Sequence, residues 1–223
     1  MIPADREAFF EQQRSKMVQE QLRARGITDQ RLLAAFLKVP RHLFVPAEYR
    51  NQAYEDHPLP IGFEQTISQP YIVGLMIHSL ALKGHERVLE IGGGSGYQTA
   101  LLAEMALEVH SIERIPELMV AARRCLHELG YSNVAVTAGN GSLGLPEKSP
   151  FDAIIVSAAS PQMPKPLLGQ LNDPGRMVLP LGDRQAQSLV RVEKRHGQMT
   201  TTELGGCMFV PLLGEYGWPS GQP

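Results

Sequence analysis

The stretch that decides the fold is VLEIGGGSGYQ, residues 88–98 of a chain of 223 residues. It opens with an apolar run that ends at Ile91 and is typical of a buried β-strand. Three alternate glycines follow, Gly92, Gly94 and Gly96, and glycines at such a turn let the backbone approach a ligand closely. Free N–H groups at the start of a following helix favour a polar or anionic group. The stretch therefore predicts a strand, a turn and a helix that together hold a nucleotide-like ligand.

The spacing of these glycines separates the possible ligands. The dinucleotide fingerprint G-x-G-x-x-G needs a third glycine at position 97, where this chain has Tyr97, so the pattern weighs against a nicotinamide cofactor. A Walker-type phosphate loop fits less well still, because no Lys-Ser or Lys-Thr pair follows the glycines. What remains is a nucleotide-like ligand of another kind.

Two acidic residues near the turn sharpen this prediction. Glu113 follows Glu90 by roughly 20 residues, where a carboxylate accepts hydrogen bonds from both ribose hydroxyls of an adenosine. Glu90, beside the turn, suits a ligand that carries an ammonium and a sulfonium, and it would repel a pyrophosphate. S-adenosyl-L-methionine has this charge pattern, and we place Arg114, next to Glu113, in the same cofactor-binding set. Two plainer interpretations stay open: a solvated Glu113 at a strand end, and a Glu90 that caps neighbouring backbone.

The pattern around the turn predicts a sheet covered by helices on both faces. Short apolar strands alternate with helices, and such alternation implies a parallel sheet. The expected strands are 87–91, 108–112, 134–138 and 151–156, and the expected helices are 71–82, 97–105 and 116–129. Four further strands are expected at 177–182, 188–194, 200–206 and 207–213, with a hairpin turn at His196-Gly197. The predicted fold class is α/β, a Rossmann-like doubly wound, mostly parallel sheet with antiparallel C-terminal strands.

We expect one domain with four parts. Residues 1–70 carry two helices, 5–25 and 29–38, followed by an ordered loop, PLPIGFEQTISQP, that packs on the core. Residues 71–175 form the cofactor-binding core, 176–213 the C-terminal strands and 214–223 a flexible tail. A single domain of this length buries roughly 70% of the surface that its unfolded chain exposes, so it needs no cross-link for stability.

A third polar element follows the expected strand 134–138. Gly139-Asn140-Gly141 lies where open α/β sheets bind ligands, at the carboxyl ends of the strands. The side-chain oxygen of Asn140 is a candidate contact for an adenine amino group, and Gly141 belongs to the same cofactor-binding set. Asn-Gly is also an ordinary turn dipeptide, so this motif alone is a weak signal.

Composition and charge exclude several classes of protein. Lys and Arg number 21 and Asp and Glu 23, so the net charge of −2 gives no field for a nucleic-acid backbone. The N-terminus is too polar for a secretory signal, and the apolar stretch 71–82 is short of the roughly 20 residues that span a bilayer. Cys125 and Cys207 are far apart, and no cluster has metal-ligand spacing. We expect a cytoplasmic protein with reduced thiols, no metal, and no membrane or nucleic-acid partner.

Five segments taken together resemble the protein-L-isoaspartate O-methyltransferase family. They are VPRHLFVP (39–46), PLPIGFEQTISQPY (58–71), VLEIGGGSGYQ (88–98), SPFDAIIVSAASPQMP (149–164) and GRMVLPLG (175–182). The glycine turn alone indicates only a methyltransferase, whereas TISQP with the upstream PLPIG is far more specific. The resemblance implies a class I S-adenosylmethionine-dependent enzyme that methylates the α-carboxylate of L-isoaspartyl residues in damaged proteins and peptides. The ester then closes to a succinimide, which reopens partly to aspartate.

The resemblance also implies roles for single residues. Ser68 matches the family's active-site serine, a hydroxyl donor that orients the acceptor carboxylate. Thr66, Ile67 and Gln69 line the same loop, and Tyr71 follows where the family's loop enters its helix beside the cofactor. The acceptor carboxylate has a pKa near 3.5 and is already ionised at neutral pH, so no general base is needed. A serine that only supports a loop turn is the plainer alternative.

Arg41 and His42 of the VPRHLFVP segment are the other polar candidates near this loop. Arg41 would attract the substrate carboxylate if it faced the cleft, and His42 is a second candidate to face it. Structural hydrogen bonding is favoured for both, so neither is included in the predicted site. We expect the protein to act as a monomer.

Three departures from the family's pattern keep other functions open. Gly93 replaces a small polar residue, which is expected only to loosen the turn. Glu64 stands where a small residue is common and adds repulsion toward an anionic substrate, and Asn140 replaces the Asp of a G-D-G motif. Two alternatives follow: a methyltransferase of the same fold with a different acceptor, and a non-catalytic module that binds the cofactor or an isoaspartyl ligand.

Overall fold

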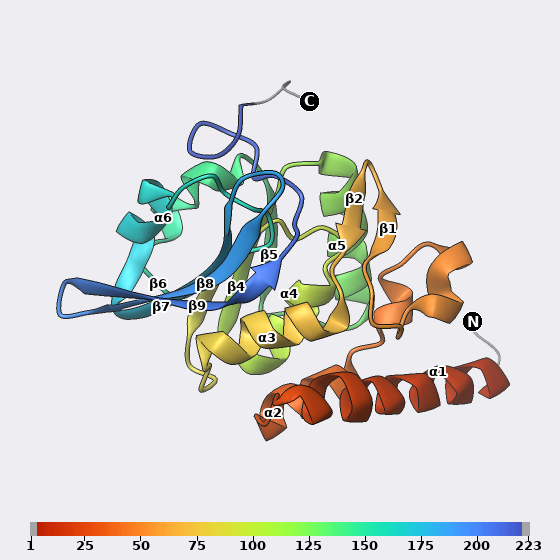
Figure 1. The fold of residues 1–223 in the computed structure, drawn as a ribbon. Coiled ribbons are helices and arrows are strands. Elements are labelled where there is room, and N and C mark those ends of the chain that lie inside the picture. Colours follow the sequence, from red (N-terminus) through yellow and green to blue (C-terminus); the bar gives the residue numbers. More distant parts are fainter. Residues whose placement is uncertain (1–3, 220–223) are drawn as a thin grey trace.

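The computed structural model describes residues 4–219, and its centre is a seven-stranded sheet (Figure 1). The strand order is β5-β4-β3-β6-β7-β8-β9; the strands from β5 to β7 run parallel, and β8 and β9 are added antiparallel. The strands are β3 Arg87–Ile91, β4 Glu108–Glu113, β5 Val134–Ala138, β6 Phe151–Val156, β7 Leu171–Gly182, β8 Gln187–Arg195 and β9 Gln198–Cys207. The predicted fold class is confirmed.

The strand order reverses at β3, which lies between β4 and β6. In open α/β sheets, ligands bind outside the carboxyl ends of the strands at such a switch point. The glycine turn leaves β3 at this point, so the fold places it where a ligand is expected.

Within residues 4–219, six α-helices accompany the sheet, and local sequence explains where several of them begin. They are α1 Ala4–Met17, α2 Gln30–Lys38, α3 Pro70–Leu80, α4 Tyr97–Met105, α5 Pro116–Glu128 and α6 Lys165–Gln170. Asp29 is the N-cap of α2, because its carboxylate accepts hydrogen bonds from the N–H groups of Arg31 and Leu32. Proline at the first position starts α3 and α5, where its missing N–H is not needed.

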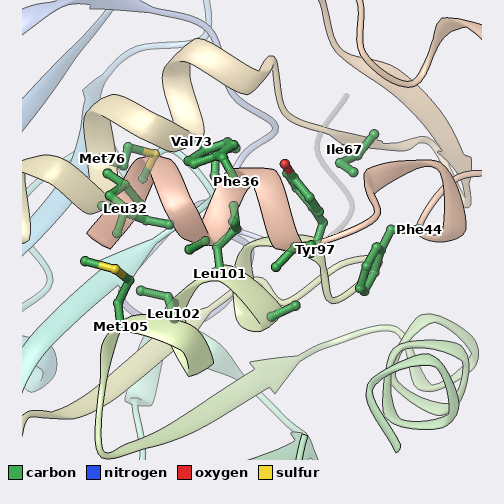
Figure 2. Packing of buried hydrophobic residues seen from close by; sticks show 14 of the residues in the cluster. Leu32, Phe36, Phe44, Ile67, Val73, Met76, Tyr97, Leu101, Leu102 and Met105 are labelled. Carbon is green, nitrogen blue, oxygen red and sulfur yellow. The ribbon is translucent and has the colours of Figure 1, made fainter. Parts of the chain in front are cut away.

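Alternate residues of β3 point to opposite faces of the sheet, and each face is covered. Val88 faces a cluster that contains the apolar sides of α2, α3 and α4. Figure 2 shows this packing, with Phe36 of α2, Met76 of α3 and Leu101 of α4 in one cluster. Leu89 faces the second cluster, which contains residues of α6. Full burial of each such side chain contributes about 1.5–3 kcal/mol, so both layers hold the strand ends in place.

The N-terminal helix is less regular than expected. The predicted helix 5–25 is α1 as far as Met17, continues as a wider π-helical turn over Val18–Leu22 and a 3-10 turn over Arg23–Arg25, and ends at Gly26 with φ +91°. The following part, 40–58, contains two short 3-10 helices, Arg41–Leu43 and Ala47–Gln52. Residues Leu43 to Ala47 and Arg50 of this part line a cavity together with Ser95 of the glycine turn.

A buried aromatic cluster fixes α1 to this segment. The Phe10 ring stacks on His42 with 4.0 Å between centroids, and His42 Nδ1 and the Tyr54 hydroxyl form a 2.8 Å hydrogen bond. Burial, aided by the positive charges of Arg14 and Arg50, lowers the pKa of His42 from 6.5 to about 4. His42 is thus neutral at physiological pH and has the structural role that the sequence favoured.

This lowered pKa predicts a loss of stability in mild acid. A histidine whose pKa is lower in the folded than in the unfolded protein stabilises the fold above pH 6.5, and this contribution disappears between about pH 6.5 and 4. We expect the wild type to lose about 2–4 kcal/mol more unfolding free energy over this window than His42→Gln, which does not titrate. Urea unfolding of both proteins at pH 7.5, 5.5 and 4.5 measures the difference. Parallel pH profiles would contradict the assignment.

Two parts of the chain differ from the sequence-based expectation. The expected loop 58–70 contains a hairpin, β1 Leu59–Gly62 and β2 Gln65–Ile67, which forms its own two-stranded sheet. The expected strand 207–213 is wrong: β9 includes Cys207, and the chain then leaves the sheet. Residues 208–213 instead contact the loop after β6, with one isolated bridge between Ala159 and Pro211. The predicted hairpin turn at His196-Gly197 is confirmed, since both residues have positive φ between β8 and β9.

The tail also differs from expectation over its first part. Trp218 forms a bridge with Leu213, and the Gly214 N–H donates to the Trp218 carbonyl at 3.0 Å, so residues 214–218 have backbone partners within the segment 212–218. Residues 220–223 of the expected tail lie outside the described residues. Among the helices of residues 4–219, none is long and apolar enough to cross a membrane.

Candidate active site

The glycine turn is held rigidly against the neighbouring strand. The N–H groups of Gly92 and Gly93 both donate to the Ile112 carbonyl, at 2.8 and 3.3 Å, and the Gly96 N–H donates to Gly93. Gly92, Gly94 and Gly96 all have positive φ, between 53° and 88°, which residues with a side chain rarely adopt. The predicted strand, turn and helix are therefore confirmed, and the alternate glycines are required by the backbone.

Glu113 is bonded directly to this turn. One carboxylate oxygen accepts from the Gly94 N–H at 2.8 Å, and the other accepts from the Ile115 N–H at 2.8 Å. The side chain is buried at the end of β4 and lines the cleft described next. Each carboxylate oxygen has two acceptor sites, so one on each oxygen stays available to a ribose hydroxyl.

A cleft of about 330 Å³ lies over the turn, within the size range of small-molecule sites. The β1–β2 hairpin forms its roof: a Cβ built on Gly94 would lie 3.4 Å from Ile61 Cδ1. The lining residues come mainly from the hairpin, the glycine turn, the ends of β4 and β6, and the C-terminal segment. They are Ile61, Phe63 to Thr66, Ile91, Gly92, Gly94, Ile112 to Ile115, Gly141, Ser157, Ala158, Arg184 and Val210 to Leu213. The predicted residues Thr66, Gly92, Gly94, Glu113, Arg114 and Gly141 are thus brought together.

A smaller compartment of about 40 Å³ adjoins this cleft. It contains Ser68, and it shares with the cleft the walls made by Thr66, Gly92, Gly94 and Ser157. Within the described part of the chain, no residue hydrogen bonds the Ser68 hydroxyl. The TISQP serine therefore lines a space beside the glycine turn that Glu113 does not line, and its hydroxyl is available to a ligand.

Glu90 does not line either space. Its carboxylate is fully buried and accepts hydrogen bonds from the hydroxyls of Thr99 and Ser111, at 2.5 and 2.6 Å, and from the Gln98 amide at 3.1 Å. Burial raises the pKa of Glu90, which these hydrogen bonds oppose. Instead of facing the ligand, Glu90 ties β3, β4 and α4 together beneath the turn.

The structure also separates other predicted residues from the cleft. The Tyr71 ring lies under the Arg25 guanidinium, 3.4 Å from ring centroid to Cζ, and neither lines the cleft. Gln69 donates to the Asp56 carbonyl at 3.0 Å and anchors the loop from behind. Asn140 lines a neighbouring cavity, and its side-chain oxygen accepts hydrogen bonds from Ser142.

Gly93 has a more specific role than the expected loosening. A Cβ at this position would lie 2.4 Å from Ser111 Oγ, the same hydroxyl that donates to Glu90. The absence of a side chain at 93 therefore allows Ser111 to complete the network beneath the turn.

The hairpin tip carries strained backbone that the sequence pattern did not reveal. Phe63 and Glu64 form a two-residue loop between Gly62 and Gln65, and both have positive φ, 53° and 58°. Such loops favour Asn-Gly, because other residues are strained there. A small residue is therefore easier to accommodate at position 64 than the glutamate of this chain.

We expect the double substitution Phe63→Asn and Glu64→Gly to raise the unfolding free energy by about 1–2 kcal/mol, since it relieves this strain. Chemical denaturation measures the change. Phe63→Ala is the control, because it removes the half-exposed ring and keeps the strain. A stability equal to that of the control would show that the tip is not strained.

Comparison with known proteins identifies the family. The model of the family Protein-L-isoaspartate(D-aspartate) O-methyltransferase matches residues 12–217. The chain belongs to this family. Its fold, its S-adenosylmethionine dependence and its class of activity, predicted from the five segments, are thereby confirmed.

Relatives and solved structures cover nearly all of this methyltransferase. A protein-L-isoaspartate O-methyltransferase of Syntrophobacter fumaroxidans is 56% identical over 94% of this chain and 98% of its own, and one of Dictyoglomus turgidum is 57% identical over 91% and 92%. A solved protein-L-isoaspartate O-methyltransferase superimposes with a TM-score of 0.81 at 29% identity, over 92% of this chain and 67% of its own. A Plasmodium falciparum structure in complex with S-adenosyl-L-homocysteine has a TM-score of 0.78 at 25% identity, over 92% and 98%.

The residues of the cleft fit S-adenosylmethionine. The turn offers close backbone approach at Gly92 and Gly94, Glu113 has acceptor sites for a ribose, and Ile112 and Leu212 give apolar walls for a flat ring. Within the described residues, no group of three or more side chains could hold a metal ion.

Two of the parts of the site that were not predicted from sequence are of particular interest. One is the C-terminal segment Val210 to Leu213, which was interpreted as a strand. The other is Tyr97, used only to exclude a dinucleotide fingerprint although it lines the compartment of Ser68. Tyr97 directly follows the glycine turn as the first residue of α4, and this position in the sequence indicates that it lies near the ligand.

Proposed function

We propose that this protein transfers a methyl group to the α-carboxylate of L-isoaspartyl residues in proteins and peptides, in the compartment of Ser68. The observation that carries the proposal is the adjacency of two spaces across the glycine turn. One suits an adenosine-containing donor and the other has room for a carboxylate. Membership of the family supports the same assignment.

The reaction requires that the acceptor carboxylate is positioned against the methyl group and that water is excluded. When bound, S-adenosylmethionine supplies a methyl group on a cationic sulfur. A carboxylate oxygen forms the new bond to the methyl carbon while the electrons of the S–C bond stay on sulfur, so no proton moves. The chain must hold this oxygen about 3–3.5 Å from the methyl carbon and in line with the breaking bond. Ser68 donates its hydroxyl hydrogen to the carboxylate, and the hairpin residues Thr66 and Ile67 exclude water.

Matched peptides test the proposal. One peptide carries an L-isoaspartyl residue and the other an aspartyl residue in the same sequence, and both are incubated with methyl-labelled S-adenosylmethionine. We expect label on the isoaspartyl peptide alone, released as methanol when the ester closes to a succinimide. Equal labelling of both peptides, or none on the isoaspartyl peptide, would contradict the proposal.

One observation favours a different acceptor as the second candidate. Glu64 lines the cleft with an exposed carboxylate at the hairpin tip, where it repels an anionic substrate. Ions in solution screen such exposed charges over about 8–10 Å, so the repulsion is weak at physiological salt. Turnover with small-molecule acceptors that carry no negative charge, and none with the peptides, would favour this candidate. Cofactor binding without any turnover would favour a non-catalytic module.

We further propose that the protein works as a cytoplasmic monomer without a nucleic-acid partner. The net charge of −2 supports the last point, and the most exposed apolar side chains, such as Leu107 and Met208, are far apart in the fold. Light scattering at micromolar concentration tests the oligomeric state.

A further inference from the structure

Arg41 is a fully buried cation with unused hydrogen-bond donors. Its Nε donates to the Ala53 carbonyl at 2.6 Å, but within the described residues Nη1 and Nη2 have no partner. Burial lowers the pKa of Arg41 to about 10, so it stays charged at neutral pH. Buried charges are normally paired, because transfer from water without compensation is costly. Arg41 lines neither space of the site, so direct contact with a substrate is excluded.

Tyr97 connects this cation to the site. The Arg41 guanidinium lies 4.9 Å from the centroid of the Tyr97 ring, and Tyr97 lines the small compartment together with Ser68. The Tyr97 hydroxyl is buried and has no hydrogen-bond partner within the described residues. Figure 2 shows the phenol directed between Ile67 and Val73, toward the segment that carries Ser68.

The charges around the pair leave an excess of positive charge. Arg14 acts on the Tyr97 phenol with the same sign as Arg41. The carboxylate that acts on Arg41 is that of Asp56. One of its oxygens accepts from Arg25 at 2.7 Å, and the other is buried without a partner among the described residues, so this single carboxylate faces the three cations Arg14, Arg25 and Arg41. The compartment beside Tyr97 is therefore suited to an anion.

We propose that Tyr97 binds the acceptor carboxylate through its hydroxyl, and that Arg41 is a positioning residue that acts through the Tyr97 ring. The inference deepens the proposed function and rests on it. Ser68 holds the oxygen that reacts, and Tyr97 donates its hydroxyl hydrogen to the other oxygen. Arg41 makes the small compartment electropositive without touching the substrate.

The roles of Tyr97 and Arg41 predict different effects on the peptide KM and on kcat. Methyl transfer cancels the negative charge of the acceptor against the positive charge of the donor, so the carboxylate has its full charge only before the reaction. A positive potential and a hydrogen bond to the non-reacting oxygen thus stabilise the bound substrate at least as much as the transition state. Their loss raises KM for the peptide and leaves kcat nearly unchanged.

Tyr97→Phe, with Tyr54→Phe as a matched control, is the first test. Both variants lose one buried tyrosine hydroxyl, but that of Tyr54 is bonded to His42 and lies outside the small compartment. We expect Tyr97→Phe to raise the peptide KM about tenfold, with kcat and the S-adenosyl-L-homocysteine dissociation constant within about twofold. Tyr54→Phe is expected to keep the peptide KM and to lower the melting temperature. Tyr97→Phe is expected to keep its melting temperature, because the lost hydroxyl has no protein partner.

Arg41→Met and Arg41→Lys test the charge. The first removes the charge at similar length, and we expect a peptide KM raised about tenfold; the second keeps the charge, and we expect a KM within about threefold of wild type. If Arg41→Met does not fold, Tyr97→Phe decides. A peptide KM within twofold of wild type for Tyr97→Phe would overturn the inference, as would equal KM values for the two Arg41 variants.

Wild-type turnover separates this inference from the proposed function. A wild type that does not methylate the isoaspartyl peptide would refute the function itself. An active wild type with unchanged KM in Tyr97→Phe would refute only the assignment of Tyr97 and Arg41.

Discussion

Replacing Ser68 with alanine is expected to lower kcat/KM for an isoaspartyl peptide by about 10- to 100-fold, the equivalent of a hydrogen bond to a charged group. The hydroxyl has no protein partner in the described part of the chain and faces the glycine turn from the small compartment. Its loss leaves the reacting oxygen free to turn away from the line of attack. Initial rates at varied peptide concentration, with saturating S-adenosylmethionine, give the value.

Cofactor affinity distinguishes this role from a structural one. We expect the dissociation constant of S-adenosyl-L-homocysteine to stay within about twofold in Ser68→Ala, because the serine does not line the larger cleft that contains Glu113. Ser79→Ala is the control: its hydroxyl donates to the Leu75 carbonyl within α3, away from both spaces. Equal kcat/KM values for Ser68→Ala and wild type would leave Ser68 as a loop residue only.

Replacing Glu113 with alanine is expected to weaken cofactor binding, the quantity that Ser68→Ala leaves nearly unchanged, and to do so more than any other substitution considered. We propose that this carboxylate accepts two ribose hydrogen bonds, which the substitution removes together with the contacts that hold the Gly94 and Ile115 N–H groups. We expect the dissociation constant of S-adenosyl-L-homocysteine to rise by about 100-fold or more. Titration calorimetry measures it directly.

Two controls keep this result interpretable. Glu117→Ala removes an exposed carboxylate in the first turn of α5 and is expected to leave the affinity unchanged. Thermal unfolding of Glu113→Ala without ligand shows how far the turn itself is weakened. If a folded Glu113→Ala protein binds as tightly as wild type, the carboxylate does not hold the ribose.

The parallel part of the fold could be predicted from sequence because its signals are local. Apolar runs such as VLEI, ended by glycine, give the strands, and Pro116 marks the start of a helix. The β1–β2 hairpin was missed because its strands are three and four residues long and its tip, Phe63-Glu64, is not a typical turn dipeptide. The apolar run 208–213 has strand-like composition, but its partner, Ala159, is distant in sequence.

The sequence predicts those site residues whose position depends on the local backbone conformation or on the end of a strand. The glycines and Glu113 are of this kind. The direction of Glu90 is not readable from a parallel strand, because both faces of such a strand are buried and either neighbour can receive the side chain. The partners Thr99 and Ser111 come from different elements, and only the packed fold brings them together. The position of Tyr71 outside the cleft has a similar cause, because Arg25, from a turn distant in sequence, covers its ring.

The cleft is lined by chain segments that come before the first strand and after the last strand of the seven-stranded sheet. Ile61 comes from the hairpin that precedes every strand of the sheet, and Val210 to Leu213 follow the final strand, β9. During synthesis, a chain that has made the glycine turn and Glu113 still lacks one wall until residue 213 has left the ribosome. The complete donor site therefore exists only after the whole sheet is assembled, and donor binding adds its full stabilisation at that stage.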